Sequence, residues 1–237
     1  MSVLFFKIVN RKKRGFSMKK LVASIMTADQ MNIGKEVQDC LEAGIDWLHC
    51  DVMDGVFVDN LAMGPYQIES LLKVEELTLD IHLATVTPER YIKLFGPLKP
   101  HYITFHIETV ANPQACIDLI RSYGCKVGLA ISPQTSFKAV IPYMDQIDLL
   151  LVMTVNPGFA GQQFNMDVLD KLKLITEYID THELKHILIE VDGNIYEKTI
   201  ELMKDFKVDL YVLGTSALFK DDGKSYLEKA DTLRELF

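Results

Sequence analysis

Eight short, apolar, β-rich segments recur along the chain, and segments with helical spacing separate most of them. The eight segments are residues 21–27, 47–54, 79–85, 102–108, 126–132, 147–155, 186–193 and 210–218. Strands that alternate with helices along a chain pair in parallel within one sheet. Eight such units are the number that closes a (β/α)8 barrel. The alternation therefore predicts an α/β fold, a single (β/α)8 TIM barrel.

The segments between the strands support this interpretation. Residues 34–46 and 165–180 each carry one apolar stripe at helical spacing, formed by Val37, Cys40, Leu41 and Ile45 in the first and by Val168, Leu169, Leu172 and Ile175 in the second. A glycine at a break such as Ala43-Gly44 is a usual helix stop. An open doubly wound sheet is the alternative, but the chain lacks the G-x-G-x-x-G turn typical of its nucleotide-binding members.

Composition restricts the partners and the compartment. The chain has 237 residues, 49% of them apolar, and a formal net charge of −8. This charge argues against a nucleic acid or an anionic membrane as the main partner, although backbone N–H groups can still bind a phosphate. The four cysteines show no C-x-x-C spacing, which is typical of core residues in a reducing, cytoplasmic compartment. No apolar run is long enough to span a bilayer.

The first 17 residues differ from the rest of the chain. Their basic cluster follows a short apolar run, which is the wrong order for a secretory signal. We therefore interpret residues 1–17 as a tail outside the native protein, with Met18 as the native start. Residues 18–237 would then form the barrel domain.

The second β-rich segment carries a histidine and an aspartate on one face. His49 and Asp51 are two residues apart, so their side chains point the same way, and burying them is costly unless a partner satisfies them. His82 and Asp192 lie late in two other strands, and a barrel gathers the ends of its strands at one mouth. Two imidazoles and two carboxylates suit Zn²⁺, Fe²⁺, Mn²⁺ or Co²⁺. These four residues are the predicted ligands of one divalent metal ion.

The other polar residues of the strands receive ordinary structural interpretations. His106 has no partner at its spacing and is expected to be a core histidine. Asp80 is early in its strand and is expected on the stability side of the barrel, away from the site. Asp54 is expected to act locally in the turn after the second strand. Three further histidines are expected at the surface: His101, His182 and His186.

Three glycine-bearing stretches follow strands, at residues 156–162, 192–194 and 214–219. Each is open to interpretation as a tight turn, since glycine supplies positive φ. Barrels also bind phosphate with the loops after their seventh and eighth strands, so the stretches equally fit a phosphate site. Met53 and Met153 would face inward near the predicted metal site and could form an apolar wall around the reacting carbon.

The chain resembles the ribulose-phosphate 3-epimerase family from about Leu21 to Phe219. The resemblance rests on ordered blocks: SIMTAD, HCDVMDGVFVDNLAMGP, DIHLATVTPERYI, ITFHIE, VNPGFAGQQF, EVDGNI and GTSALF. It implies a barrel of the ribulose-phosphate-binding type and an isomerase of carbohydrate metabolism. The expected reaction interconverts D-ribulose 5-phosphate and D-xylulose 5-phosphate, a step of the pentose phosphate pathway. The expected partners are a small phosphorylated ketose and further copies of the chain in a homo-oligomer.

The resemblance also implies roles for particular residues. His49, Asp51, His82 and Asp192 would bind the metal ion, and Asp51 and Asp192 would be the acid/base pair that transfers the proton through a metal-stabilised enediolate. Ser24, together with Met53 and Met153, would contact the substrate near the metal. The remaining substrate-binding positions would hold the phosphate: Gly158, Phe159, Ala160, Gly161, Gly193, Asn194, Gly214 and Thr215.

Four departures from the family pattern bear on the substrate. Val56 stands where the family has His, Asp59 where it has Pro, Ala84 where it has Met, and Asn194 replaces the second Gly of D-G-G. Some spellings are closer to allulose-6-phosphate 3-epimerases, so a six-carbon substrate is the alternative, and the loss of Met at Ala84 would enlarge the pocket. A metal-free barrel lyase would need a lysine late in a strand, which is missing. A non-catalytic sugar-phosphate-binding barrel has no need of an acid/base pair.

Overall fold

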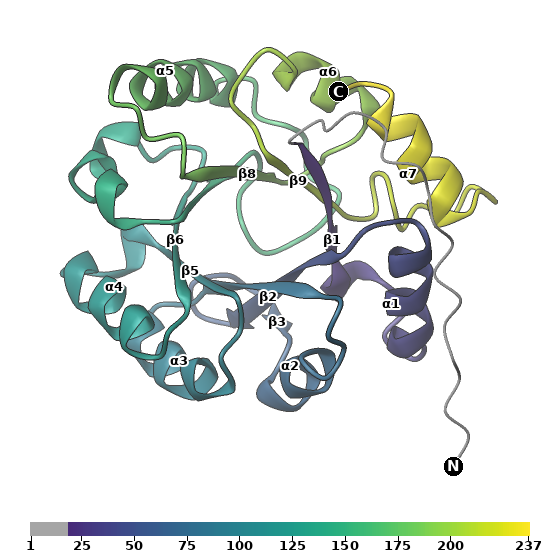
Figure 1. Ribbon diagram of the computed structural model, residues 1–237, viewed down its shortest axis with the longest axis horizontal. Coiled ribbons are helices and arrows are strands. Elements are labelled where there is room, and N and C mark those ends of the chain that lie inside the picture. Colours follow the sequence, from purple (N-terminus) through teal and green to yellow (C-terminus); the bar gives the residue numbers. More distant parts are fainter. Residues whose placement is uncertain (1–18) are drawn as a thin grey trace.

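The computed structural model describes residues 19–237, and the expected tail, residues 1–17, and the expected start at Met18 lie outside this range. Nine strands are present in it: β1 Lys20–Ser24, β2 Trp47–Asp54, β3 Leu61–Ala62, β4 Thr78–Ala84, β5 Tyr102–His106, β6 Lys126–Ile131, β7 Leu149–Met153, β8 Leu188–Asp192 and β9 Leu210–Leu213. All except β3 run parallel, and β1 pairs with both β9 and β2. This pairing closes an eight-stranded barrel and confirms the predicted single (β/α)8 TIM barrel (Figure 1).

Helices surround the barrel on its outer side (Figure 1). They are α1 Ile33–Glu42, α2 Pro65–Leu71, α3 Pro88–Phe95, α4 Pro113–Ser122, α5 Val168–Thr181, α6 Glu197–Met203 and α7 Tyr226–Arg234. Short 3-10 turns join some elements: η1 Ile25–Thr27, η2 Gly96–Leu98, η3 Ile107–Thr109, η4 Phe137–Ala139 and η5 Ile141–Gln146. Among residues 19–237, no helix is both long and apolar enough to cross a membrane.

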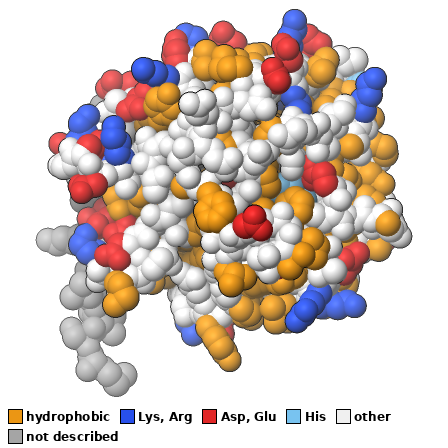
Figure 2. Space-filling model, turned by 180° about the vertical axis from the view of Figure 1, so that it is seen from behind, with side chains coloured by type: hydrophobic (Ala, Val, Ile, Leu, Met, Phe, Trp, Pro, Cys, Tyr) orange, Lys and Arg blue, Asp and Glu red, His pale blue; other side chains and the backbone are white. Residues whose placement is uncertain are grey.

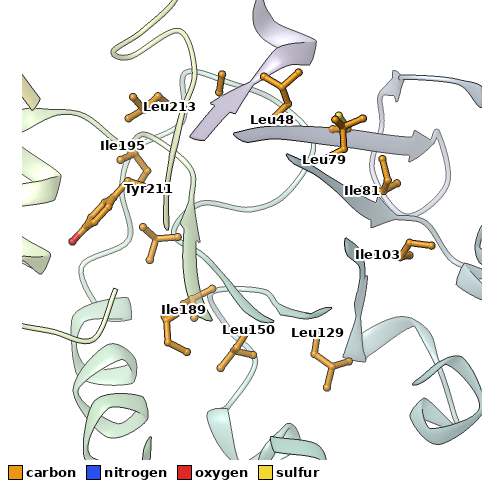
Figure 3. Packing of buried hydrophobic residues seen from close by; sticks show 14 of the residues in the cluster. Leu48, Leu79, Ile81, Ile103, Leu129, Leu150, Ile189, Ile195, Tyr211 and Leu213 are labelled. Atoms are coloured by element: carbon orange, nitrogen blue, oxygen red, sulfur yellow. The ribbon is translucent and has the colours of Figure 1, made fainter. Parts of the chain in front are cut away.

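The main core lies between the barrel and the helices. Outward-facing strand residues fill it, as Figure 3 shows for Leu48, Leu79, Ile81, Ile103, Leu129, Leu150 and Ile189. Alternate residues of the same strands face the barrel interior, where a second cluster contains Val22, Trp47, Tyr102, Ala130, Leu149, Leu151, Met153, Leu210 and Val212. Both faces of each strand are therefore covered, which explains why the strands read as nearly continuous apolar runs.

The predicted helical stripes are mostly buried. Val37 and Cys40 of α1 are buried, while Leu41 is only half-buried. Ile45 is fully buried but lies beyond the end of α1, because the chain turns at Gly44, whose φ is +72°. All four cysteines are buried and free, as expected for core residues.

All the barrel strands except β2 end earlier than the apolar pattern predicted, and β1 and β5 pass directly into a 3-10 turn. The expected strand 21–27 ends at Ser24, and the expected strand 102–108 ends at His106. In each case a 3-10 turn follows, and a threonine three residues on donates its hydroxyl to the last strand carbonyl, Thr27 to Ser24 and Thr109 to His106. These local hydrogen bonds turn the chain at the mouth of the barrel, where Ser24 and His106 then lie.

Candidate active site

A pocket of about 570 Å³, open mouth included, lies at the carboxyl ends of the strands. Its walls come from β1, β2, β4, β7, β8 and β9 and the loops that follow β1, β7, β8 and β9. Asp51, His82 and Asp192 line the pocket, and His49 lies fully buried beside them. The site therefore lies where the rule for TIM barrels locates it.

The four predicted metal ligands converge. The Nε2 of His49 lies 3.2 Å from the Nδ1 of His82, and the Nδ1 of His82 lies 3.0 Å from Oδ1 of Asp51. The Nε2 of His49 also lies 3.9 Å from Oδ2 of Asp192. One ligand atom from each residue lies within 4.8 Å of all the others.

These donor atoms fit a divalent metal ion. Their neighbouring separations resemble the edge of a tetrahedron, about 3.4 Å for a metal that lies about 2.1 Å from each nitrogen and oxygen. Two imidazole nitrogens and two carboxylates are a donor set for Zn²⁺, Fe²⁺, Mn²⁺ or Co²⁺ rather than for a thiolate-binding metal. The four residues can therefore hold one such ion without rearrangement of the strands.

Two buried carboxylates that the sequence interpretation did not assign to the site lie behind His49. The Nδ1 of His49 lies 3.1 Å from Oδ2 of Asp80 and 3.6 Å from Oε1 of Glu190. Asp80 also accepts a hydrogen bond of 2.7 Å from the Thr104 hydroxyl. Asp80 was expected away from the site, and this was wrong because the register of β2 and β4 pairs His49 directly with Asp80.

The second ligand histidine has a different support. The Nε2 of His82 lies 2.9 Å from Nε2 of His106, and the Nδ1 of His106 lies 3.1 Å from Oε2 of Glu108. The ring of Phe57 covers His106 at 4.8 Å between ring centres. His106 is fully buried, as expected of a core histidine. The expectation that it has no partner was wrong, because Glu108 lies two residues after it and folds back onto it.

The two aspartates of the site differ in proton affinity. Burial, together with the charge of Asp51, raises the pKa of Asp192 to about 7. Burial opposes ionisation of Asp51 as well, but His49 and His82 outweigh it and hold the Asp51 pKa well below its usual range. Burial, assisted by Asp80, likewise raises the pKa of Glu190 to about 8. Without a metal ion, Asp51 is therefore ionised, whereas Asp192 readily holds a proton.

All the residues predicted to contact the substrate line the pocket: Ser24, Met53, Met153, Gly158, Phe159, Ala160, Gly161, Gly193, Asn194, Gly214 and Thr215. The Ser24 hydroxyl is also 3.2 Å from Oδ2 of Asp51, to which it donates a hydrogen bond. Nine further lining residues were not named individually as substrate contacts: Met26, Thr27, Val155, Asn156, Pro157, Gln162, Ile195, Val212 and Ser216. Four of them lie inside the predicted glycine-bearing stretches, namely Asn156, Pro157, Gln162 and Ser216. Extending each stretch by two residues would also have found Val155, Ile195 and Val212.

The loops after β8 and β9 offer backbone donors to the pocket. Within residues 19–237, the backbone N–H groups of Asn194 and Thr215 donate no hydrogen bond. Asn194 has a φ of +54°, which it tolerates in place of glycine, and its side chain accepts a hydrogen bond of 2.8 Å from Ser216. No lysine or arginine is among the residues that line the pocket. An anion bound here would be held by N–H groups rather than by side-chain cations.

The surface agrees with this distribution of charge. Figure 2 shows the face opposite to that of Figure 1, with histidine visible between the loops near the middle and most lysine and arginine side chains toward the rim. Three histidines outside the site, His101, His182 and His186, are exposed, as expected. Asp54 acts in its turn, as expected, and accepts hydrogen bonds from the N–H groups of Val56 and Phe57, both at 2.9 Å.

The departures from the family pattern occupy different environments. Val56 is exposed, at 70% of its surface, and Asp59 is exposed in the same loop. Ala84 is fully buried against Met53 and Val58 and is not among the residues that line the pocket. Ala84 therefore forms no part of the pocket wall, whereas Met53 from the same cluster does.

Comparison with known proteins is consistent with this site. A sequence model described as the ribulose-phosphate 3 epimerase family matches residues 20–219. A relative named ribulose-phosphate 3-epimerase from Buchnera aphidicola is 42% identical over 202 residues, which cover 84% of this chain and 88% of the relative. A protein of the same name from Bacillus subtilis is 36% identical and covers 89% and 97% of the two chains.

Solved structures share the fold at low sequence identity. 3-Keto-L-gulonate-6-phosphate decarboxylase from Vibrio cholerae superposes with a TM-score of 0.66 at 16% identity, covering 92% of this chain and 96% of the other. 3-Hexulose-6-phosphate synthase from Salmonella typhimurium gives a TM-score of 0.64 at 13% identity, with 92% and 97% covered. These likenesses concern the barrel alone, whereas the sequence matches extend through the site. The chain belongs to the ribulose-phosphate 3-epimerase family.

Proposed function

We propose that the chain is a metal-dependent ketose-phosphate 3-epimerase, an isomerase that interconverts D-ribulose 5-phosphate and D-xylulose 5-phosphate. The observation that carries the proposal is the convergence of His49, Asp51, His82 and Asp192 beside a pocket whose far side is formed by glycine-bearing loops. Inversion of a carbon next to a carbonyl needs a proton removed from one face and another returned to the opposite face. Asp51 and Asp192, from β2 and β8, are the carboxylates proposed for these two steps.

The placement of the two aspartates on different strands, β2 and β8, suits this division of work. A carboxylate that is ionised can accept the proton, while one that holds a proton can return it to the other face. Ser24 would orient the Asp51 carboxylate through its hydrogen bond of 3.2 Å. Met26, Met53 and Met153 would exclude water from the reacting carbon, because their apolar side chains line the same part of the pocket.

The proposed cofactor is one divalent ion, Zn²⁺, Fe²⁺, Mn²⁺ or Co²⁺, held by His49, Asp51, His82 and Asp192. Such an ion supplies positive charge for oxygens of the substrate as negative charge develops on them. The phosphate of the substrate would lie at the N–H groups of Asn194 and Thr215 and at the loop 156–162. With its phosphate held by these donors, the substrate would extend its carbon chain toward Asp51 and Asp192.

A five-carbon substrate is favoured over D-allulose 6-phosphate. The two relatives described above carry the name ribulose-phosphate 3-epimerase. The argument for a wider pocket depended on Ala84, and Ala84 is covered by Met53 and Val58. The ratio of kcat/KM for D-ribulose 5-phosphate and D-allulose 6-phosphate, measured on one metal-loaded preparation, tests this choice; a higher value for the hexulose would reverse it.

A lyase and a pure binding protein are disfavoured. The lysines of the described strands, Lys20 and Lys126, lie at strand starts, at the end of the barrel opposite the pocket. A binding protein would not need two aspartates, from different strands, that both line the pocket. The proposal also includes a cytoplasmic location, which the free buried cysteines support. It further includes a homo-oligomer, supported by exposed apolar side chains such as Leu61 and Tyr66 and testable by light scattering.

Asparagine substitutions test the chemistry. Asp51→Asn and Asp192→Asn should each lower kcat by about 10²–10⁴-fold, because each removes one proton-transfer group while its size is kept. Asp59→Asn is the matched control, since Asp59 is exposed in the loop after β2 and should retain full activity. Circular dichroism and metal content are measured in parallel. Wild-type turnover in both site variants would refute the two-carboxylate mechanism.

A further inference from the structure

We infer that Glu108 is a positioning residue that, through His106, fixes which nitrogen of His82 carries the hydrogen and so keeps the other nitrogen open toward the metal site. The inference rests on the proposed function only in that His82 is taken as a metal ligand. Glu108 itself lies outside the pocket lining and contacts neither the proposed metal ligands nor the pocket. Its effect must therefore pass through His106.

The direction of the hydrogen bonds follows from Glu108. Its carboxylate is an acceptor only, so the Nδ1 of His106, 3.1 Å from Oε2, must carry a hydrogen. A neutral imidazole then has a lone pair on its other nitrogen, so the Nε2 of His106 accepts. The Nε2 of His82, 2.9 Å away, must therefore be the donor. This leaves the lone pair of His82 on Nδ1, which faces His49 and Asp51.

The other oxygen of Glu108 prevents rotation of the carboxylate. Oε1 accepts a hydrogen bond of 2.7 Å from the N–H of Ser132 and a further one from the Thr135 hydroxyl. Both donors belong to the loop after β6, and Lys171 of α5 holds the same loop by donating to the carbonyls of Ser132 and Pro133. Glu108 is thus fixed between a loop that presents two donors and an imidazole that presents a third.

Glutamine cannot replace Glu108 without a conflict on one side. If its amide NH₂ faces His106, then Nδ1 of His106 must accept and Nε2 must carry the hydrogen. The Nε2 of His82 would then accept, and the hydrogen of His82 would move to Nδ1, against the metal site. If the amide NH₂ instead faces the loop, it opposes the backbone N–H of Ser132, which can only donate, although the Thr135 hydroxyl could turn to accept. Only a group with acceptors on both sides satisfies His106 and the loop together.

Asp80 has the corresponding role for the other histidine ligand, His49, which it contacts directly. Oδ2 of Asp80 lies 3.1 Å from Nδ1 of His49, so its charge favours a hydrogen on Nδ1 and the lone pair on Nε2, although the geometry of the pair is not that of a hydrogen bond. Partners of this kind orient a ligand imidazole and raise its affinity for metal. The barrel therefore uses one carboxylate directly on His49 and one carboxylate through a second histidine on His82.

The decisive measurement is the tautomer of each ring, read from long-range ¹H–¹⁵N correlation spectra of Zn²⁺-loaded protein labelled in histidine, because without a cation the lone pairs of His49 and His82 would oppose each other and the Asp51 carboxylate. The rings of His82 and His106 are assigned by single substitutions of the other histidines. The wild-type protein should show hydrogen on Nε2 of His82 and on Nδ1 of His106. Hydrogen on Nε2 of His106 in the wild-type protein would overturn the inference, and this result does not depend on whether any variant folds.

Glu108→Gln supplies the second readout. It should shift His82 toward hydrogen on Nδ1 and weaken metal binding by about 10–100-fold in chelator competition. Thr135→Val is the matched control, because it removes one donor from Oε1 but leaves Oε2 on His106, and its metal affinity should stay within about 2-fold of the wild type. Equal losses in both variants would assign the effect to the loop and overturn the inference. If the wild-type protein binds no divalent metal, the proposed function fails, whereas the hydrogen that Glu108 requires on Nδ1 of His106 can still be read from the metal-free protein.

Discussion

Thr104 provides a stability test of the interior of the barrel. Its hydroxyl donates a hydrogen bond of 2.7 Å to Oδ1 of Asp80, and both side chains are fully buried. Gly128 on the neighbouring strand leaves the space for this hydroxyl, because a Cβ there would lie 2.1 Å from Oγ1 of Thr104. Thr104→Val keeps the shape of the side chain and removes the donor, so one oxygen of a buried carboxylate loses its partner.

The expected loss follows from the charge of Asp80. A hydrogen bond to an ionised group contributes about 1.5–3 kcal/mol, so Thr104→Val should lower the free energy of unfolding by that amount. For a domain of this size each kcal/mol corresponds to about 2–4 °C, which gives a fall in Tm of about 3–12 °C. Urea denaturation and calorimetry of the metal-free protein measure both quantities without a contribution from metal binding.

Thr104→Ser is the control for this substitution. Serine keeps the hydroxyl and loses one methyl group, which costs about 0.8 kcal/mol for the buried carbon. The serine variant should therefore be more stable than the valine variant. If valine equals the wild type, or exceeds serine in stability, the hydrogen bond to Asp80 does not stabilise the fold and the reasoning is refuted.

Three further predictions concern the pocket loops and Glu108. Gly193→Ala should raise KM and lower Tm, because φ is +117° at this position and a Cβ would lie 2.5 Å from Cγ2 of Val155; steady-state kinetics and calorimetry measure both. The free energy of unfolding, measured with urea, should be about 1 kcal/mol lower for Asn194→Ala than for Asn194→Gly, because alanine tolerates the φ of +54° at this position less well than glycine. Burial opposes ionisation of Glu108, but its hydrogen bonds, first from His106, hold its pKa at about 2, below the ordinary 4.5. Its stabilising effect is therefore complete above the ordinary value and is lost as the pH falls toward 2, so the stability advantage of wild type over Glu108→Gln in urea should shrink below about pH 4.5.

The order of the strands and the face on which each side chain lies could be predicted from the sequence because they depend on local information, whereas most strands end earlier than the apolar pattern predicted. Alternation along each segment determines which side chains share a face, and the rule for barrels locates the late residues at one mouth. His49, Asp51 and Asp192 were found in this way, since each is polar in an apolar run. The glycine-bearing loops were found because they follow the last three strands directly.

The supporting residues could not be predicted in this way because their contacts depend on the stagger between strands. Asp80 occupies an early position in β4, yet the register pairs it with His49 rather than with the residue before it in β2. Glu190 did carry a local signal, since it lies two residues before Asp192 and so on the same face of β8. His106 carried a similar signal, since Glu108 lies two residues after it, the spacing that pairs His49 with Asp51.

The charge of the interior connects these supporting residues to the proposed cofactor. Among residues 19–237, four carboxylates gather around the site, Asp51, Asp80, Glu190 and Asp192, whereas the buried lysines, Lys171 and Lys229, belong to outer helices. Unpaired buried charge is costly, and without a cation part of that cost is removed by protons, as the raised pKa values of Asp192 and Glu190 indicate. A divalent ion would supply the missing positive charge at the one point where four donor atoms already meet. The carboxylates behind His49 therefore make best physical sense as part of a metal site rather than as a device for stability.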